Sequence, residues 1–219
     1  MTIVARLTKT RIFVSNKQKK MSEFDSRAQD WDKIPYHWER AEAVAECFRG
    51  MVPINNQMKA LEYGAGTGIL SFLLSKEFLE ITLMDNSEEM VKVMHEKVAA
   101  SGLKNLKPLL FDLEHSNYPE SKFDCIFSQM VLHHISDTEI FLDKCHRMLN
   151  PDGYLVVADL FTEDGTFHGP EAKVHWGFDP DDLSKKLQTM GFKTIGHKTC
   201  YIIKRHENTY PLFLLVAKA

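Results

Sequence analysis

The sequence predicts an α/β protein built on a doubly wound, mostly parallel sheet that ends in an antiparallel hairpin. Short apolar segments alternate with amphipathic helical segments from about residue 58 to residue 190. This alternation is typical of βαβ units, in which helices cover both faces of a parallel sheet. The last two apolar segments, 194–204 and 209–217, are instead joined by a short polar stretch, which favours an antiparallel pair.

Each predicted strand is a short apolar run bounded by acids or turn residues. We expect strands at 58–63, 81–85, 107–111, 123–128 and 154–159, and helices at about 68–77, 87–101, 137–149 and 180–190. The N-terminal segment 22–52 places apolar residues at three- and four-residue steps, which predicts a helix with one buried face. Asn86 and Ser136 are each followed three residues later by a glutamate, and we expect them to cap two of the helices.

Length and composition bound the class of protein. The 219 residues suit one folded unit, with 57–219 as its body, 22–56 as a helical cap and 1–21 as a basic extension. No apolar run approaches the roughly 18–20 residues that a transmembrane helix needs, so we expect no membrane span. The net charge of -3 argues against a general nucleic-acid binder. The four scattered cysteines predict neither a zinc ribbon nor a disulfide framework.

The first twenty residues differ in charge from the rest. They contain six Lys or Arg and no Asp or Glu. An acid-free basic start is typical of an organelle transit peptide, whereas Met21 followed by Ser-Glu-Phe-Asp also reads as a natural start, and a lid strand is a third interpretation. We expect a cytoplasmic protein, with an organellar location as the alternative if residues 1–20 are a transit peptide.

A glycine-rich loop at 62–68, Glu-Tyr-Gly-Ala-Gly-Thr-Gly, joins the first predicted strand to a helix. Glycines allow the backbone to turn sharply and to approach a ligand closely. The dinucleotide fingerprint GxGxxG would place its third glycine where Ile69 stands. The acid Glu62, just ahead of the glycines, disfavours a pyrophosphate and favours a cationic ligand. S-adenosylmethionine, with its sulfonium and α-ammonium groups, fits this charge.

Acids end the next two predicted strands. Asp85 ends the second strand, where a carboxylate would accept two hydrogen bonds from a ribose diol. Asp112 ends the third strand, where it would take an adenine amino group. The alternatives are a helix cap for Asp85 and a surface acid for Asp112.

The motifs between Ala60 and Gly153 resemble the cofactor-binding core of class I S-adenosylmethionine-dependent methyltransferases. They are most similar to the small-molecule group that includes the ubiquinone and menaquinone C-methyltransferases. The matching pieces occur in order at 62–68, 84–87, 111–113, 123–124, 128–135 and 149–153, and 24–32 is similar to the opening segment of that group.

The resemblance implies a Rossmann-like, seven-stranded sheet and S-adenosyl-L-methionine (AdoMet) as the cofactor, with S-adenosyl-L-homocysteine (AdoHcy) as its product. Trp31 stands near the position where such proteins carry an aromatic residue over the cofactor, more usually a tyrosine. The cofactor-binding residues that we expect are Trp31, Glu62, Gly64, Ala65, Gly66, Thr67, Gly68, Asp85, Asn86, Met90, Asp112, Leu113, Gln129, Met130 and His133.

Methyl transfer from a sulfonium is an in-line displacement on an already activated carbon. The protein has mainly to align the reacting atoms and exclude water, and a base matters only for a protonated acceptor. No catalytic residue is assigned from the sequence; the candidates are His133, His168 and His175. The loop 162–177 is long enough to predict a lid or an acceptor-binding segment. The spacing of its two histidines matches no ligand motif, so we expect no metal.

The acceptor is expected to be a small molecule, with methylation on oxygen, nitrogen or carbon left open. Strand 123–128 is not followed by the Asn/Asp-Pro-Pro-aromatic stretch of enzymes that methylate base amines. A non-catalytic AdoMet-binding regulator or assembly factor is the alternative, and an NAD-dependent oxidoreductase is a weaker one. The sequence predicts no oligomeric state.

Overall fold

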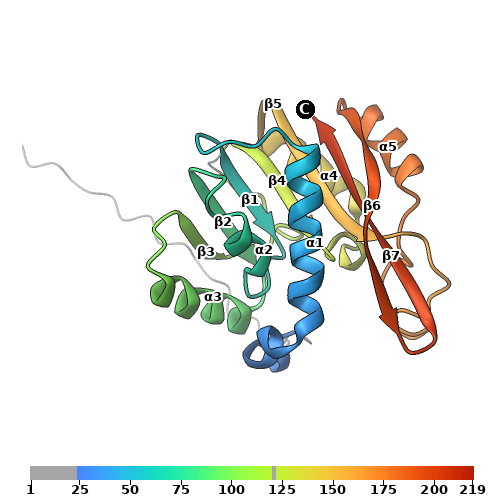
Figure 1. Ribbon diagram of the computed structural model, residues 1–219. Coiled ribbons are helices and arrows are strands. Elements are labelled where there is room, and N and C mark those ends of the chain that lie inside the picture. The colour runs from blue at the N-terminus through green and yellow to red at the C-terminus, as the bar shows by residue number, and fades with distance from the viewer. Residues whose placement is uncertain (1–23, 120–121) are drawn as a thin grey trace, which may run out of the picture.

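The computed structural model describes residues 24–119 and 122–219, which form one seven-stranded sheet between two layers of helices (Figure 1). The strand order is β3-β2-β1-β4-β5-β7-β6. Strands β1 to β5 pair in parallel, and β7 is antiparallel to both of its neighbours. The predicted fold class is therefore confirmed. The strands are β1 Lys59–Tyr63, β2 Glu80–Asp85, β3 Leu106–Leu110, β4 Phe123–Gln129, β5 Leu149–Leu160, β6 Lys193–Arg205 and β7 Asn208–Lys218.

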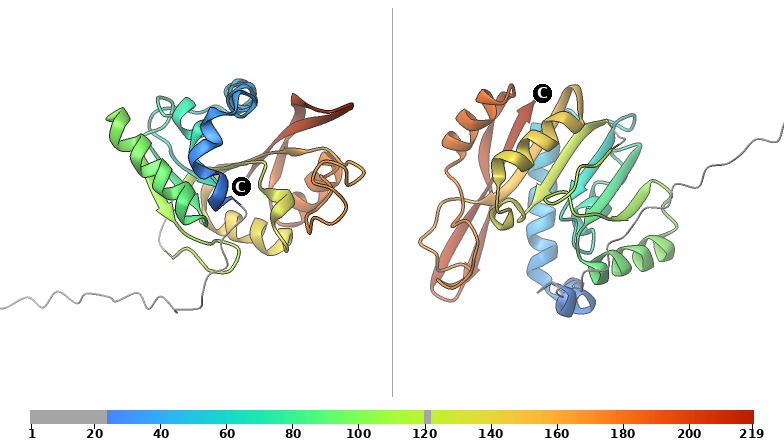
Figure 2. Two further views of the ribbon diagram at one scale, coloured as in Figure 1. Left: turned by 90° about the horizontal axis from the view of Figure 1, so that it is seen from below. Right: turned by 180° about the vertical axis from the view of Figure 1, so that it is seen from behind.

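The helices bury apolar side chains on both faces of this sheet (Figure 2). On one face, α1, α2 and α3 share a core with alternate strand residues such as Ala60 and Val156. On the other face, α4 and α5 pack over the intervening residues, such as Leu61 and Val157. The helices are η1 Asp25–Lys33, α1 Pro35–Met51, α2 Ile69–Leu73, α3 Glu88–Ser101, η2 Leu132–His134, α4 Thr138–Met148 and α5 Pro180–Thr189.

The predicted N-terminal helix is two elements. Residues 25–33 form a 3₁₀ helix, and the α-helix begins at Pro35. Ile34 between them is extended, because the ring of a following proline disfavours the helical conformation. In α1 the residues Ala41, Ala45 and Phe48 are buried, as the apolar spacing predicted. The break at Ile34 lets η1 turn away from α1 and lie against α3.

Both predicted helix caps are wrong by one residue. The N-cap of α3 is Ser87, whose hydroxyl accepts from the Met90 N–H, and the N-cap of α4 is Asp137. Asp85 accepts a hydrogen bond from the Ser87 N–H, so Asn86 is held inside a turn. Ser136 is likewise held before the helix, since its N–H donates to Glu114.

The predicted basic extension, residues 1–21, lies outside the described residues. Among residues 24–119 and 122–219, no helix is long and apolar enough to cross a membrane. In the sheet, β1 lies between β2 and β4, so the chain leaves β1 toward one neighbour and returns on its other side. In open α/β sheets such a reversal leaves a crevice at the carboxyl ends of the strands, where ligands bind.

Candidate functional site

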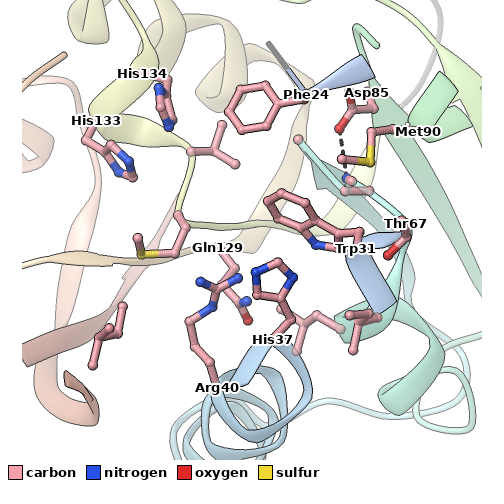
Figure 3. Close-up of a pocket in the computed structure, with 18 of the residues that line it drawn as sticks. Phe24, Trp31, His37, Arg40, Thr67, Asp85, Met90, Gln129, His133 and His134 are labelled. Carbon is pink, nitrogen blue, oxygen red and sulfur yellow. Dashed lines mark hydrogen bonds between the residues drawn. The ribbon is translucent and has the colours of Figure 1, made fainter. Parts of the chain in front are cut away.

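A cavity of about 880 Å³ opens at this reversal, next to the carboxyl ends of β1, β2 and β4. Its size is within the range of small-molecule sites. The elements η1 and α1 form one wall, and Phe167, His168 and part of β6 form another. Figure 3 shows Asp85 and Thr67 on one side of the cavity and His133 and His134 on the other.

The three loop glycines all have positive φ angles but serve different purposes. A Cβ on Gly64 would lie 2.4 Å from the Val131 side chain, and one on Gly68 would lie 2.6 Å from Leu83. At Gly66 the nearest atom to such a Cβ is the Trp31 Nε1, 4.0 Å away. Gly64 and Gly68 therefore allow close packing within the protein, and Gly66 keeps the cavity open.

Asp85 presents a fixed carboxylate beside the glycine loop. One oxygen, Oδ2, accepts from the Gly66 N–H at 2.8 Å, and Oδ1 accepts from the Ser87 N–H at 2.8 Å. The residue is 8% exposed, and this burial raises the pKa of the Asp85 carboxyl, against the effect of the N–H donors. The backbone thus positions the acid before any ligand arrives.

The side chain of Glu62 is buried, whereas the prediction that it attracts a cationic ligand treated it as a charged group. Its Oε2 accepts from the Ser71 hydroxyl at 2.5 Å and from the Ser71 N–H at 3.2 Å. Burial raises the pKa of Glu62 to about 8, and the hydrogen bonds from Ser71 only partly oppose this. Burial therefore favours the protonated form of Glu62, and a cationic ligand beside it would favour the charged form.

Between the two sides, buried polar atoms lack partners among the described residues. They are the Arg40 Nε, the His37 Nδ1 and the Gln129 Oε1, and all three side chains line the cavity (Figure 3). Arg40 is 7% exposed, and no described carboxylate lies within ion-pair distance of it. Because buried polar groups are nearly always hydrogen-bonded, these atoms indicate that a polar ligand completes the site.

Three histidines gather at the far side of the cavity. The His133 Nδ1 lies 2.6 Å from the Asp159 Oδ1, and both residues are fully buried. The His133 Nε2 lies 3.0 Å from the His168 Nε2, and the His134 ring centroid is 4.2 Å from that of His133. Burial lowers the pKa of His134 to about 3 and that of His168 to about 4. Burial alone would raise the pKa of Asp159, but His133 holds it below its usual value.

Residues 61–157 match the family described as a methyltransferase domain. The match places a methyltransferase domain in this part of the chain. An uncharacterized methyltransferase of Schizosaccharomyces pombe is 32% identical over 135 residues, 58% of this chain and 45% of that protein. Malonyl-[acyl-carrier protein] O-methyltransferase 1 of Ilyobacter polytropus is 29% identical over 161 residues, 69% of this chain and 59% of that protein. The chain spans about half the length of these curated relatives.

A solved structure shares the fold. The crystal structure of a SAM-dependent methyltransferase from Aquifex aeolicus superposes with a TM-score of 0.64 at 23% identity, covering 89% of this chain and 97% of that one. The family match and the shared fold support the predicted methyltransferase domain and its cofactor, AdoMet. The geometry of the cavity fits this cofactor: Asp85 provides an acceptor for a diol, and Gly66 leaves room beside it.

Most of the predicted cofactor residues line the cavity of the methyltransferase domain. Those that do are Trp31, Glu62, Gly64, Ala65, Gly66, Thr67, Asp85, Asn86, Met90, Gln129, Met130 and His133. Gly68, Asp112 and Leu113 are not among the lining residues. Asp112 lies 2.9 Å from the His115 Nδ1, and Leu113 is buried in the core. The cofactor roles of all these residues remain predictions.

The three candidate catalytic histidines do not all lie at the cavity. His133 and His168 line the cavity, whereas His175 does not. The His175 N–H donates to the His133 carbonyl, and its ring lies 3.0 Å from the Ile135 carbonyl. His175 thus ties the loop 162–177 to the segment after β4 and brings His168 to the cavity.

Sequence reasoning missed several polar lining residues, among them Arg27, Arg40, Tyr201 and Arg205. Arg40, Tyr201 and Arg205 lie on α1 and β6, outside the matching motifs, and Arg27 lies on η1 within segment 24–32, where no role was assigned to it. One signal for Arg40 was present, because it stands four residues before Val44 in the buried face of α1. An arginine inside an apolar stripe indicates a buried charge that needs a partner.

Proposed function

We propose that this protein transfers a methyl group from AdoMet to a small-molecule acceptor bound at the histidine side of the cavity. One observation carries the proposal: the fixed carboxylate of Asp85 and the imidazoles of His134 and His168 line the same cavity. A donor site and a group able to take a proton therefore share one enclosed space.

The glycine-loop side would hold the cofactor. Asp85 would accept hydrogen bonds from the ribose hydroxyls, because its two oxygens are already oriented by backbone N–H groups. Arg40 would pair with the methionine carboxylate, which supplies the anion that its buried guanidinium lacks. When bound, AdoMet supplies a methyl carbon on a positively charged sulfur.

The histidine side would hold the acceptor. Asp159 fixes the tautomer and the orientation of His133, and the Nε2 atoms of His133 and His168 lie 3.0 Å apart at the cavity wall. For an acceptor whose nucleophilic atom is protonated, one of these imidazoles would take the proton. For an acceptor that is already nucleophilic, the walls formed by Phe24, Trp31 and Phe167 would align it and exclude water.

Several narrower features belong to the same proposal. The acceptor is a small molecule rather than a nucleic acid, in keeping with the net charge of -3. The protein acts in the cytoplasm, and residues 57–219 are its catalytic body with 22–56 as a cap. Membership of the group similar to ubiquinone and menaquinone C-methyltransferases is supported by the motifs between Ala60 and Gly153.

A turnover assay tests the proposal. The full chain is incubated with AdoMet and separate pools of hydroxyl, thiol, amine and carbon-acid acceptors, and AdoHcy is quantified by mass spectrometry. We expect AdoHcy to form with one pool and to fall about 100-fold in Asp85→Ala, since two charge-assisted hydrogen bonds are lost. Asp143→Ala, which removes a half-exposed acid on α4 that does not line the cavity, is the matched control.

Two results would contradict the proposal. Tight AdoMet binding without turnover in any pool would make the protein a non-catalytic regulator. Binding of NAD(H) without binding of AdoMet would make it an oxidoreductase.

A further inference from the structure

The three histidines at the far side of the cavity face one another. One nitrogen from each of His133, His134 and His168 lies within 4.8 Å of the corresponding nitrogens of the other two. The ring centroids are separated by 4.2 Å for His133 and His134, and by 5.0 Å for each of the other pairs. A base for methyl transfer needs one imidazole, so the convergence of three calls for another explanation.

The surroundings of His133 orient its free nitrogen. The Nδ1 is engaged by the Asp159 carboxylate, which is itself held by the backbone N–H groups of Leu160 and His133. A neutral imidazole that donates from Nδ1 carries its lone pair on Nε2, and this atom points to His168. A carboxylate that fixes a histidine in this way is the usual partner of a metal-binding imidazole.

We propose that His133, His134 and His168 bind one divalent transition-metal ion, with Zn²⁺ as the best fit. Three neutral nitrogen ligands on a tetrahedral ion leave a fourth position open. Zn–N bonds of about 2.0–2.1 Å place two ligand nitrogens roughly 3.3 Å apart. The 3.0 Å between the His133 and His168 nitrogens is close to this value.

On metal binding, only the ligand nitrogens that lie farther apart than about 3.3 Å have to move toward one another. His133 is fixed by its burial, whereas His134 is half-buried and His168 is exposed on the loop 162–177. Rotation of the two less buried side chains would close the remaining gap. This set could not be predicted from the sequence because it joins residues 133–134 to residue 168, a spacing that no common ligand motif uses.

The open position of the ion would face the acceptor side of the cavity, which both His134 and His168 line. The ligand for that position would be an oxygen or sulfur donor, such as an alcohol, a phenol or a thiol, since Zn²⁺ binds these atoms well. With the ion bound, the metal would promote loss of that donor's proton in place of an imidazole base. This last step rests on the proposed methyl transfer, whereas binding of the ion itself does not.

Metal titration without AdoMet tests the site. Full-length protein, freed of any affinity tag and stripped with a chelator, is titrated with Zn²⁺ by calorimetry and with Co²⁺ by visible absorption. We expect one ion per chain and the absorption of tetrahedral Co²⁺. His168→Gln and His134→Gln are each expected to weaken Zn²⁺ binding about 100-fold or more, since losing a residue that only hydrogen-bonds to a metal ligand already costs about 10–100-fold.

The matched control is His95→Gln, which removes an exposed imidazole on α3 that does not line the cavity. It should bind Zn²⁺ as the wild type does. Zn²⁺ binding that is absent in the wild type, or equal in His168→Gln, His134→Gln and the wild type, would overturn the proposal. Metal binding without methyl transfer would leave the site intact and refute the proposed function, and methyl transfer without metal binding would do the reverse.

Discussion

At one end of the cavity, backbone N–H groups of Gly66 and Ser87 hold a carboxylate, whereas at the other end a carboxylate, Asp159, holds the side chain of His133. The first end consists mainly of two short stretches, 62–67 and 85–90. The second joins residues that are 26 and 35 positions apart in the chain. Local backbone geometry therefore specifies the cofactor end, and tertiary packing specifies the histidine end.

The difference has a consequence for mutations. A buried residue at the histidine end supports the fold as well as the site, while an exposed one serves the site alone. At the cofactor end, the residues that set the backbone conformation also contact the ligand, so one substitution there affects both.

The largest expected effect is the difference in stability between the Asp159→Ala and His168→Ala variants. Asp159→Ala should lower the free energy of unfolding by about 3 kcal/mol, because His133 and two backbone N–H groups lose their acceptor in a buried site. His168→Ala should lower it by less than about 0.5 kcal/mol, because the side chain is exposed. Urea unfolding measures both values. Equal losses would mean that His168 is as structural as Asp159.

The next effect concerns the cofactor end. Gly66→Ala and Gly102→Ala both place a side chain at a positive φ and should each cost about 1 kcal/mol of stability. Only Gly66→Ala should also weaken AdoMet binding, at least about tenfold, because its methyl group would occupy the cavity next to Trp31. Gly102 ends α3 with no atom within 4 Å of such a methyl, which makes it the control. Unchanged binding by Gly66→Ala, measured by calorimetry, would contradict the role given to the loop.

Substitution of Arg40, which lies between the two ends of the cavity, tests which residue binds the AdoMet carboxylate. Wild-type protein should bind AdoMet about tenfold or more tightly than decarboxylated AdoMet, and Arg40→Met should bind both equally, because the guanidinium pairs with the carboxylate. The stability of the ligand-free variant should stay the same or rise by about 1 kcal/mol, since a buried cation without an ion-pair partner is removed. Discrimination that survives in Arg40→Met would place the carboxylate elsewhere.

The last effect is the pH dependence of stability due to Glu62. Its carboxyl ionises near 4.5 in the unfolded chain and near 8 in the folded protein. Between these pH values unfolding releases a proton, so stability falls as pH rises, by at most about 1.4 kcal/mol per pH unit. Above about pH 8 the dependence levels off. Glu62→Gln should remove this component, so the stability difference between wild type and variant should decline from pH 5 to pH 8. A flat difference in urea unfolding would show that Glu62 is charged before the ligand binds.

The sequence predicted the sheet and the cofactor end because both depend on local patterns. Alternating apolar segments mark β1 to β4 to within two residues, and the glycines of the loop 62–68 have the positive φ angles that such turns require. Strand β5 begins at Leu149 rather than 154, since Leu149 already pairs with Phe123 before the register shifts. Residues 150–153 lie within this irregular pairing.

The histidine end was only partly predictable. His133 and His168 were candidates, but their contact depends on how the loop 162–177 folds back, which His175 achieves through the His133 and Ile135 carbonyls. The role of Arg40 depends on which part of the buried face of α1 meets a cavity instead of the core. No spacing within a single segment encodes such tertiary choices.

AdoMet binding by wild-type protein and by Asp85→Ala, measured by calorimetry, tests the central claim most directly. AdoMet and AdoHcy should bind to the wild type with micromolar affinity, NAD(H) should not bind, and Asp85→Ala should weaken AdoMet binding about 100-fold. Urea unfolding of Asp85→Ala, compared with the wild type, serves as the control for folding. Wild-type affinity in Asp85→Ala, or binding of NAD(H) in place of AdoMet, would contradict the account.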